Sequence, residues 1–301
     1  MTVVLVLYIV AEIVTRLIFR PQVVPEHIYT KYSPFYDYGF SEDMPLFYEK
    51  DDKLVLYPTP YLAFWKQEMQ AHKPDDVFRI FTIGSSVSRG DLNVNYSYFL
   101  EEYLNETNVQ QKFEVINCSA TGIGSARMLL IFQKILKFEP DLVIFHLHGS
   151  NEFEDERDFA EAQKLKSSKE GIIRESWFFC VVKKFADEKI FKKFKAKEDI
   201  DAETYARWFV PGKRKEWKEI LRQNTGEIVD IAENNEIPVV FVNRVFRNDE
   251  QTVFEDQETI ELNDITQEFR RENIFIIDTP QLFMKTFGPD VNQDQIFLDT
   301  V

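Results

Sequence analysis

From residue 78 onward, short runs of β-branched and aromatic residues alternate with longer segments whose apolar residues recur at helical spacing. Strands that alternate with helices form a parallel sheet with helices on both faces. We therefore expect an α/β fold, a three-layer αβα sandwich around a mainly parallel five-stranded sheet. The predicted strands are 79–83, 113–118, 141–146, 238–245 and 274–278, and the predicted helices are 96–104, 125–137, 213–234 and 258–272.

The first 20 residues are mostly apolar, with Glu12 and Arg16 one helical turn apart. A membrane span needs about 20 apolar residues. The segment lacks the basic start and the small-residue cleavage site of a signal peptide. We interpret residues 1–20 as a membrane-anchor helix, and a buried amphipathic helix is the alternative.

Residues 21–77 are rich in tyrosine, proline and aspartate, show no sustained periodicity, and are interpreted as an irregular arm. The whole chain carries 36 Lys and Arg against 51 Asp and Glu, a net charge of −15. So acidic a chain is unsuited to nonspecific nucleic-acid binding. Basic and aromatic residues nevertheless interleave in 164–222, and we interpret about 154–222 as a helical basic insert, either a solvated cap or an interfacial lid.

Half of the ten glycines lie in three loops that directly follow the first three predicted strands. Ligands bind parallel sheets at the carboxyl ends of the strands, so these loops form the candidate site. The two cysteines form neither a disulfide framework nor a metal-ligand pattern, and no metal is expected. The glycines concerned are Gly84, Gly90, Gly122, Gly124 and Gly149.

The first loop, residues 84–90, reads GSSVSRG. It has no Gly-Lys pair for a Walker A loop, no dinucleotide fingerprint, and no Gly-x-Ser-x-Gly elbow. What remains is Ser86 at a strand-to-helix turn, where free backbone N–H groups can face developing negative charge. A helix cap and a flavin-phosphate loop are the alternatives.

The second loop, residues 117–125, reads NCSATGIGS, and Gly122 can present its N–H to a substrate oxygen there. The third, residues 146–153, reads HLHGSNEF. The Asn151 amide can act as a further donor, or serve as a turn or helix-cap residue. We interpret His146 and His148, which precede Asn151, as structural or substrate-lining.

In this order, Gly-x-Ser, Asn-x-Ser-x-x-Gly and Gly-x-Asn-Glu resemble blocks one, two and three of the SGNH (GDSL-type) hydrolase family. The resemblance covers residues 78–301 and implies a flavodoxin-like fold. The ending Asp299-Thr300-Val301 resembles the start of the fourth block, Asp-x-x-His, whose histidine would be residue 302. The domain is therefore expected to be incomplete at its C-terminus. Block one departs from the family pattern, because Ser85 replaces the usual Asp or Gly.

The resemblance implies a role for each matching residue. Ser86 would be the nucleophile, and the N–H groups of Ser86 and Gly122 would bind the oxyanion together with the Asn151 amide. Asp299 would orient the histidine, which acts as general base. The 301-residue chain alone would then hydrolyse esters poorly, and extending it with that histidine would restore activity. No cofactor is implied.

The family also implies a function: a serine esterase acting on O-acylated carbohydrate or lipid of the cell envelope, in a membrane-anchored bacterial protein. Extracytoplasmic placement follows from the resemblance, although Arg16 and Arg20 favour a cytoplasmic body by the positive-inside rule. The alternatives are an O-acyltransferase with the same site, a catalytically inactive envelope-binding domain, and a flavodoxin-like FMN protein.

Overall fold

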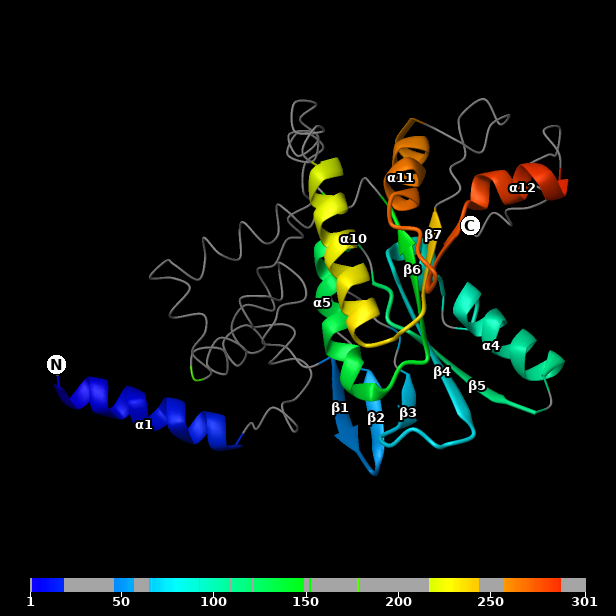
Figure 1. Ribbon diagram of the computed structural model, residues 1–301. Helices are drawn as coiled ribbons and strands as arrows, with labels where there is room; N and C mark the ends of the chain where they lie inside the picture. Colours follow the sequence, from blue (N-terminus) through cyan, green and yellow to red (C-terminus); the bar gives the residue numbers. More distant parts are fainter. Residues whose placement is uncertain are drawn as a thin grey trace, which may run out of the picture.

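The computed structural model describes residues 2–18, 46–56, 65, 67–91, 93–108, 110–120, 122–148, 152, 178, 217–243 and 257–287. In these residues the chain forms a three-stranded antiparallel sheet and a five-stranded parallel sheet (Figure 1).

All neighbouring strands of the larger sheet are parallel, and their order is β5-β4-β6-β7-β8. Numbered along the chain within this sheet, the order is 2-1-3-4-5, which is the flavodoxin-like order with its switch point between the first and third strands. The predicted mainly parallel five-stranded sheet is confirmed. The strands are β4 (Val77–Gly84), β5 (Lys112–Asn117), β6 (Leu142–Leu147), β7 (Val239–Asn243) and β8 (Ile274–Ile277).

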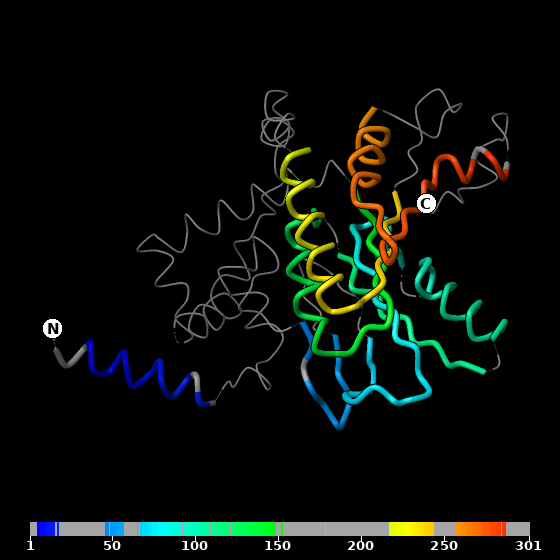
Figure 2. The backbone as a smooth tube through the Cα atoms, viewed as in Figure 1, coloured from blue at the N-terminus to red at the C-terminus, as the bar shows by residue number. Residues whose placement is uncertain are grey.

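Helices cover both faces of this sheet. On one face, α5 (Ser125–Ile135) and α10 (Trp217–Asn234) lie side by side over a core that includes Phe81 and Phe145 (Figure 2). On the other face, α4 (Tyr96–Thr107) packs Leu100 against Ile80 and Ile144. The remaining long elements are α11 (Gln257–Gln267) and α12 (Thr279–Phe287), with the short 3₁₀ helix η1 (Leu136–Phe138) after α5.

The structure differs from the expected irregular arm at residues 46–56 and 67–77. A small antiparallel sheet forms there from β1 (Phe47–Lys50), β2 (Lys53–Leu56) and β3 (Glu68–Gln70). Asp51 and Asp52 join the first two strands with φ of 51° and 61°, and two such residues in a row make the type I′ hairpin turn. Strands of three or four residues are too short to show a periodicity in the sequence.

The first described element is α1 (Thr2–Ile18), a helix of 17 residues. Its Glu12 carboxylate accepts a hydrogen bond from the backbone N–H of Phe178 at 3.0 Å, and its Tyr8 ring meets the Phe178 ring edge-on. In the part of the chain that the structure describes, none of the helices combines the length and the apolar content that crossing a bilayer requires. The predicted membrane anchor is therefore not supported.

The predicted basic insert at about 154–222 lies outside the described residues, apart from Phe178 and the first turns of α10. The described part of this region agrees with the helix predicted at 213–234, because α10 covers Trp217–Asn234.

Candidate active site

At the carboxyl end of β4 the chain turns directly into the short helix α3 (Ser86–Arg89). Ser85 is buried and holds an extended conformation, with φ −86° and ψ −160°. Ser86 is the first residue of α3, and its side chain is exposed. The only exposed hydroxyl at this turn therefore sits at the switch point of the sheet, where parallel sheets bind ligands.

Gly84 makes the tight turn possible. A Cβ atom at this position would collide with the Ser88 hydroxyl and would lie 2.7 Å from Ser88 Cβ and 3.0 Å from His146 Cβ. The first distance is shorter than side chains tolerate, so a glycine is required for α3 to start this close to β6.

A partly buried polar contact ties this turn to β6. The Ser88 hydroxyl is hydrogen-bonded to His146 Nδ1, and the His146 ring meets the Tyr96 ring edge-on at 6.3 Å. Burial raises the pKa of Tyr96, whose hydroxyl lies beside Thr82. A serine hydrogen-bonded to a histidine is the usual arrangement of an activated nucleophile. Ser88 is fully buried, however, so no ester carbonyl can reach it.

The loop after β5 runs beside the end of β4. The N–H of Cys118 donates to the carbonyl of Thr82 at 2.8 Å, and the N–H of Ala120 donates to the carbonyl of Gly84 at 3.0 Å. Gly84 is two residues before Ser86, and Ala120 is two residues before Gly122. These bonds bring the predicted nucleophile and the predicted oxyanion glycine to the same edge of the sheet.

Asn117, the last residue of β5, joins this loop to α3. Its amide donates to the carbonyls of Ser88 and Arg89 at 3.2 and 3.3 Å, while its oxygen accepts the N–H of Ser119 at 3.0 Å. The side chain is buried. The asparagine of the second motif therefore supports the turn that carries Ser86.

Gly122 adopts a left-handed conformation, with φ +66°. Its carbonyl accepts a hydrogen bond of 3.2 Å from the guanidinium of Arg127, a buried residue of α5. The bond from Arg127 therefore fixes the peptide group between Gly122 and Ile123. A residue with a side chain would be strained at this positive φ, whereas glycine is not.

Glu152 ties the third loop to the second. Its buried carboxylate accepts the backbone N–H of Ser125 at 2.7 Å and the Ser125 hydroxyl at 2.6 Å. Asn224 of α10 donates to the same hydroxyl at 2.8 Å. Ser125 begins α5, so the carboxylate also lies at the positive end of a helix dipole. The loops after β5 and β6 are thereby held together.

Of the four predicted site residues, Ser86 and Gly122 are described, and they stand in neighbouring loops at one edge of the sheet. Asn151 and Asp299 lie outside the described residues, although Asn151 adjoins Glu152 in the chain. Of the two histidines weighed as structural or substrate-lining, His146 is bound to Ser88, whereas His148 Nδ1 lies 3.6 Å from Glu258 Oε1 on α11.

Sequence reasoning missed the supporting residues Ser88, Asn117, Arg127 and Glu152. All four stand inside or next to the three motifs, so their positions were visible. The partners of Ser88, Asn117 and Glu152 were not, because hydrogen bonds between segments more than 25 residues apart leave no local pattern.

Within the described ranges, no group of three or more His, Cys, Asp or Glu side chains is arranged to hold a metal ion. Cys118 is buried and its thiol is free, and burial raises its pKa. Such a thiol stays protonated, so it is a poor nucleophile.

No protein-family model and no curated protein matches the chain. Several solved structures do. AlinE4, an SGNH-hydrolase family esterase, is 15% identical, with 76% of this chain and 87% of that chain covered and a TM-score of 0.41. The acetyl xylan esterase AlAXEase is 12% identical, with 69% and 80% covered and a TM-score of 0.42. TesA is 13% identical, with 70% and 81% covered and a TM-score of 0.39.

Proposed function

We propose that this chain is an ester hydrolase of the SGNH type in which Ser86 is the nucleophile. The observation that supports the proposal most is the convergence of three motif loops on one edge of the sheet. Ser86 is exposed there, the loop of Gly122 is bonded to the end of β4, and Glu152 fastens the loop of Asn151 to α5. Acyl transfer needs a nucleophile beside several fixed donors.

The reaction follows from these roles. A general base removes the proton of the Ser86 hydroxyl while its oxygen bonds to the carbonyl carbon, which gives a tetrahedral oxyanion. The N–H groups of Ser86 and Gly122 and the Asn151 amide stabilise that oxyanion, and a single such donor is worth about 3 kcal/mol. The carbon–oxygen bond to the alcohol then breaks, and the alcohol leaves with the proton. Water attacks the acyl-enzyme to release the acid.

The general base in the proposal is the histidine that the fourth motif places three residues after Asp299. Asp299 would orient this imidazole and stabilise its charged form. His146 is hydrogen-bonded through Nδ1 to the buried Ser88, and the proposal gives it no catalytic role.

The proposed substrate is an O-acylated carbohydrate or lipid. The hydrolysis of such esters requires an activated hydroxyl and an oxyanion hole, and these are the groups that the proposed site offers. An FMN protein shares the strand order, but it would need helix N-termini for the phosphate. Here the buried carboxylate of Glu152 already occupies the N-terminus of α5, which leaves the four-residue helix α3 as the phosphate site in that alternative.

The test is hydrolysis of p-nitrophenyl acetate by the chain extended so that a histidine stands three residues after Asp299. Ser86→Ala should lower kcat/KM by about a thousandfold or more, since the covalent route is lost. The matched hydroxyl deletion Thr107→Ala, at the exposed end of α4, should leave the rate unchanged. Full activity of Ser86→Ala would refute the nucleophile assignment.

A further inference from the structure

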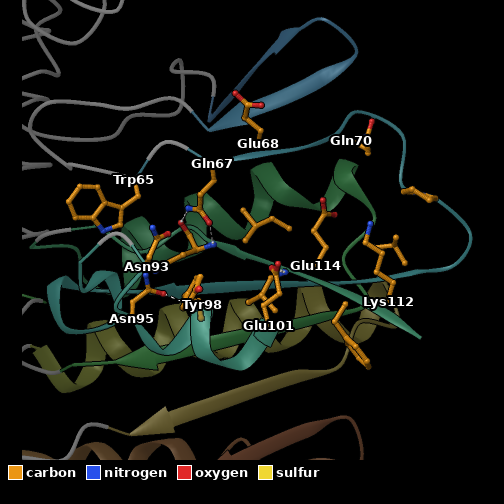
Figure 3. Close-up of a pocket in the computed structure, with 17 residues that line it drawn as sticks. Trp65, Gln67, Glu68, Gln70, Asn93, Asn95, Tyr98, Glu101, Lys112 and Glu114 are labelled. Carbon is orange, nitrogen blue, oxygen red and sulfur yellow. Dashed lines mark hydrogen bonds between the residues drawn. The ribbon is translucent and has the colours of Figure 1, made fainter. Parts of the chain in front are cut away.

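A groove of about 390 Å³ runs along the outer edge of β5, the edge strand of the parallel sheet, between α4 and the segment that leads into β3. Figure 3 shows its side chains, with Trp65 and Asn93 at one end, Lys112 at the other, and Tyr98 and Glu101 between them. The groove lies beside the sheet, and its end at Trp65 and Asn117 approaches the turn that carries Ser86.

The edge of β5 is not open to a further strand. Its outward N–H groups at Phe113, Val115 and Asn117 donate to Asn105 Oδ1, Glu101 Oε2 and Gln67 Oε1, at 2.9, 2.7 and 2.9 Å. The amide groups of Asn105 and Gln67 also donate back to the carbonyls of Phe113 and Asn117. A peptide that binds by adding a strand needs these groups. The groove therefore does not suit an extended peptide.

The charges in the groove disfavour an acidic ligand. Glu68, Glu101 and Glu114 line it, against the single cation Lys112 among its described lining residues. Glu68 is paired with Lys53 and Glu114 with Arg79, so Glu101 carries most of this effect. Glu101 uses one carboxylate oxygen for Val115, and burial raises its pKa. A desolvated carboxyl of this kind gains from a neutral hydroxyl donor.

The aromatic residues are held in place before any ligand arrives. The indole N–H of Trp65 donates to the carbonyl of Gly90 at 3.0 Å, and the guanidinium of Arg89 lies 3.9 Å from the centre of the Trp65 ring. Rigid aromatic rings offer apolar faces at little entropic cost. Arg89 and Gly90 end the helix that begins with Ser86, so this end of the groove adjoins the nucleophile turn.

Fixed aromatic rings beside carboxylate and amide groups suit a ligand with both C–H faces and many hydroxyls. We propose that the groove binds an uncharged oligosaccharide, as the glycan part of the ester whose acyl group reaches Ser86. The link to Ser86 rests on the proposed function, but binding in the groove does not.

The test uses the 301-residue chain and four neutral hexasaccharides without acyl groups, built from glucose, xylose, mannose or N-acetylglucosamine. Isothermal titration should detect at least one of them, and a hexamer of galacturonic acid should not bind. Trp65→Ala and Tyr98→Ala should each weaken binding about fivefold or more, as expected for anchor residues.

Tyr103→Ala is the matched control, because Tyr103 is also an exposed tyrosine of α4 but lies outside the groove. It should leave the affinity unchanged, and circular dichroism should show that all three variants are folded. Binding by none of the four hexasaccharides, or equal affinity in Tyr98→Ala and the native chain, would overturn the proposal. Hydrolysis of p-nitrophenyl acetate does not need the groove, so a failure here is distinct from a failure of the esterase assignment.

Discussion

Two serines of one short turn have opposite environments. Ser86 is exposed at the carboxyl end of β4, whereas Ser88 is buried and hydrogen-bonded to His146. Only the exposed hydroxyl can meet a substrate, and only the buried one can hold the turn against β6. In the sequence each serine stands two residues from a glycine, but which one is exposed depends on which side of α3 faces the sheet.

Gly84→Ala should lower the free energy of unfolding by about 2 kcal/mol or more, because the new methyl group collides with Ser88 and His146. Gly226→Ala is the matched control in the interior of α10. A Cβ there lies 3.4 Å from Phe269, an ordinary contact, and helix propensity should raise stability by about 0.5–1 kcal/mol. Urea unfolding measures both, and equal effects at the two positions would contradict the steric account.

Side chains in the loops or at the strand ends join the elements of the site. Glu152 connects the loop after β6 to the start of α5, and Asn117 connects the end of β5 to α3. Buried groups of this kind stabilise a structure only as a complete set, since removing one partner leaves another unpaired.

Glu152→Gln should lower the free energy of unfolding by about 2 kcal/mol, because its new amide N–H₂ replaces an acceptor of Ser125. Ser125→Ala removes one of the same bonds and should cost about 1 kcal/mol. The double variant should lose less than the two single losses together, with a coupling of about 0.5–3 kcal/mol. Strict additivity in denaturant unfolding would show that the contact is not formed.

The elements that the sequence predicted well are those with long, regular patterns. The run predicted at 79–83 lies inside β4 (Val77–Gly84), and the helix predicted at 125–137 contains α5 (Ser125–Ile135). The small sheet was missed because β1 to β3 are short, and its hairpin turns at two aspartates rather than at a glycine. The alternation of strands and helices in the sequence predicted which loops follow the strands. It did not predict the hydrogen bonds of Glu152 and Asn117, which join distant segments.

At the scale of the whole molecule, the two sheets share one core. Phe47 of β1 packs its ring 4.9 Å from that of Phe138 and 6.4 Å from that of Phe81 in β4. The small sheet thus shares the core of the parallel sheet rather than forming a separate arm. It also carries the segment that forms one wall of the groove beside β5.

Phe47→Ala should lower the free energy of unfolding by about 3–5 kcal/mol, as expected when a phenylalanine is removed from a core. The matched variant Phe99→Ala, on the outer side of α4 with 54% of its surface exposed, should cost less than about 1 kcal/mol. Guanidinium unfolding of both proteins makes the comparison. A loss below about 1 kcal/mol for Phe47→Ala would mean that the small sheet contributes little to the core.

The central claim is that Ser86 is the nucleophile, and covalent labelling tests it most directly. The chain extended by the histidine of the fourth motif would be treated with a fluorophosphonate, and the labelled peptide sequenced by mass spectrometry. The label should lie on Ser86 and should vanish in Ser86→Ala, while Thr107→Ala still reacts. A label on Ser88, or equal labelling in Ser86→Ala, would contradict the account.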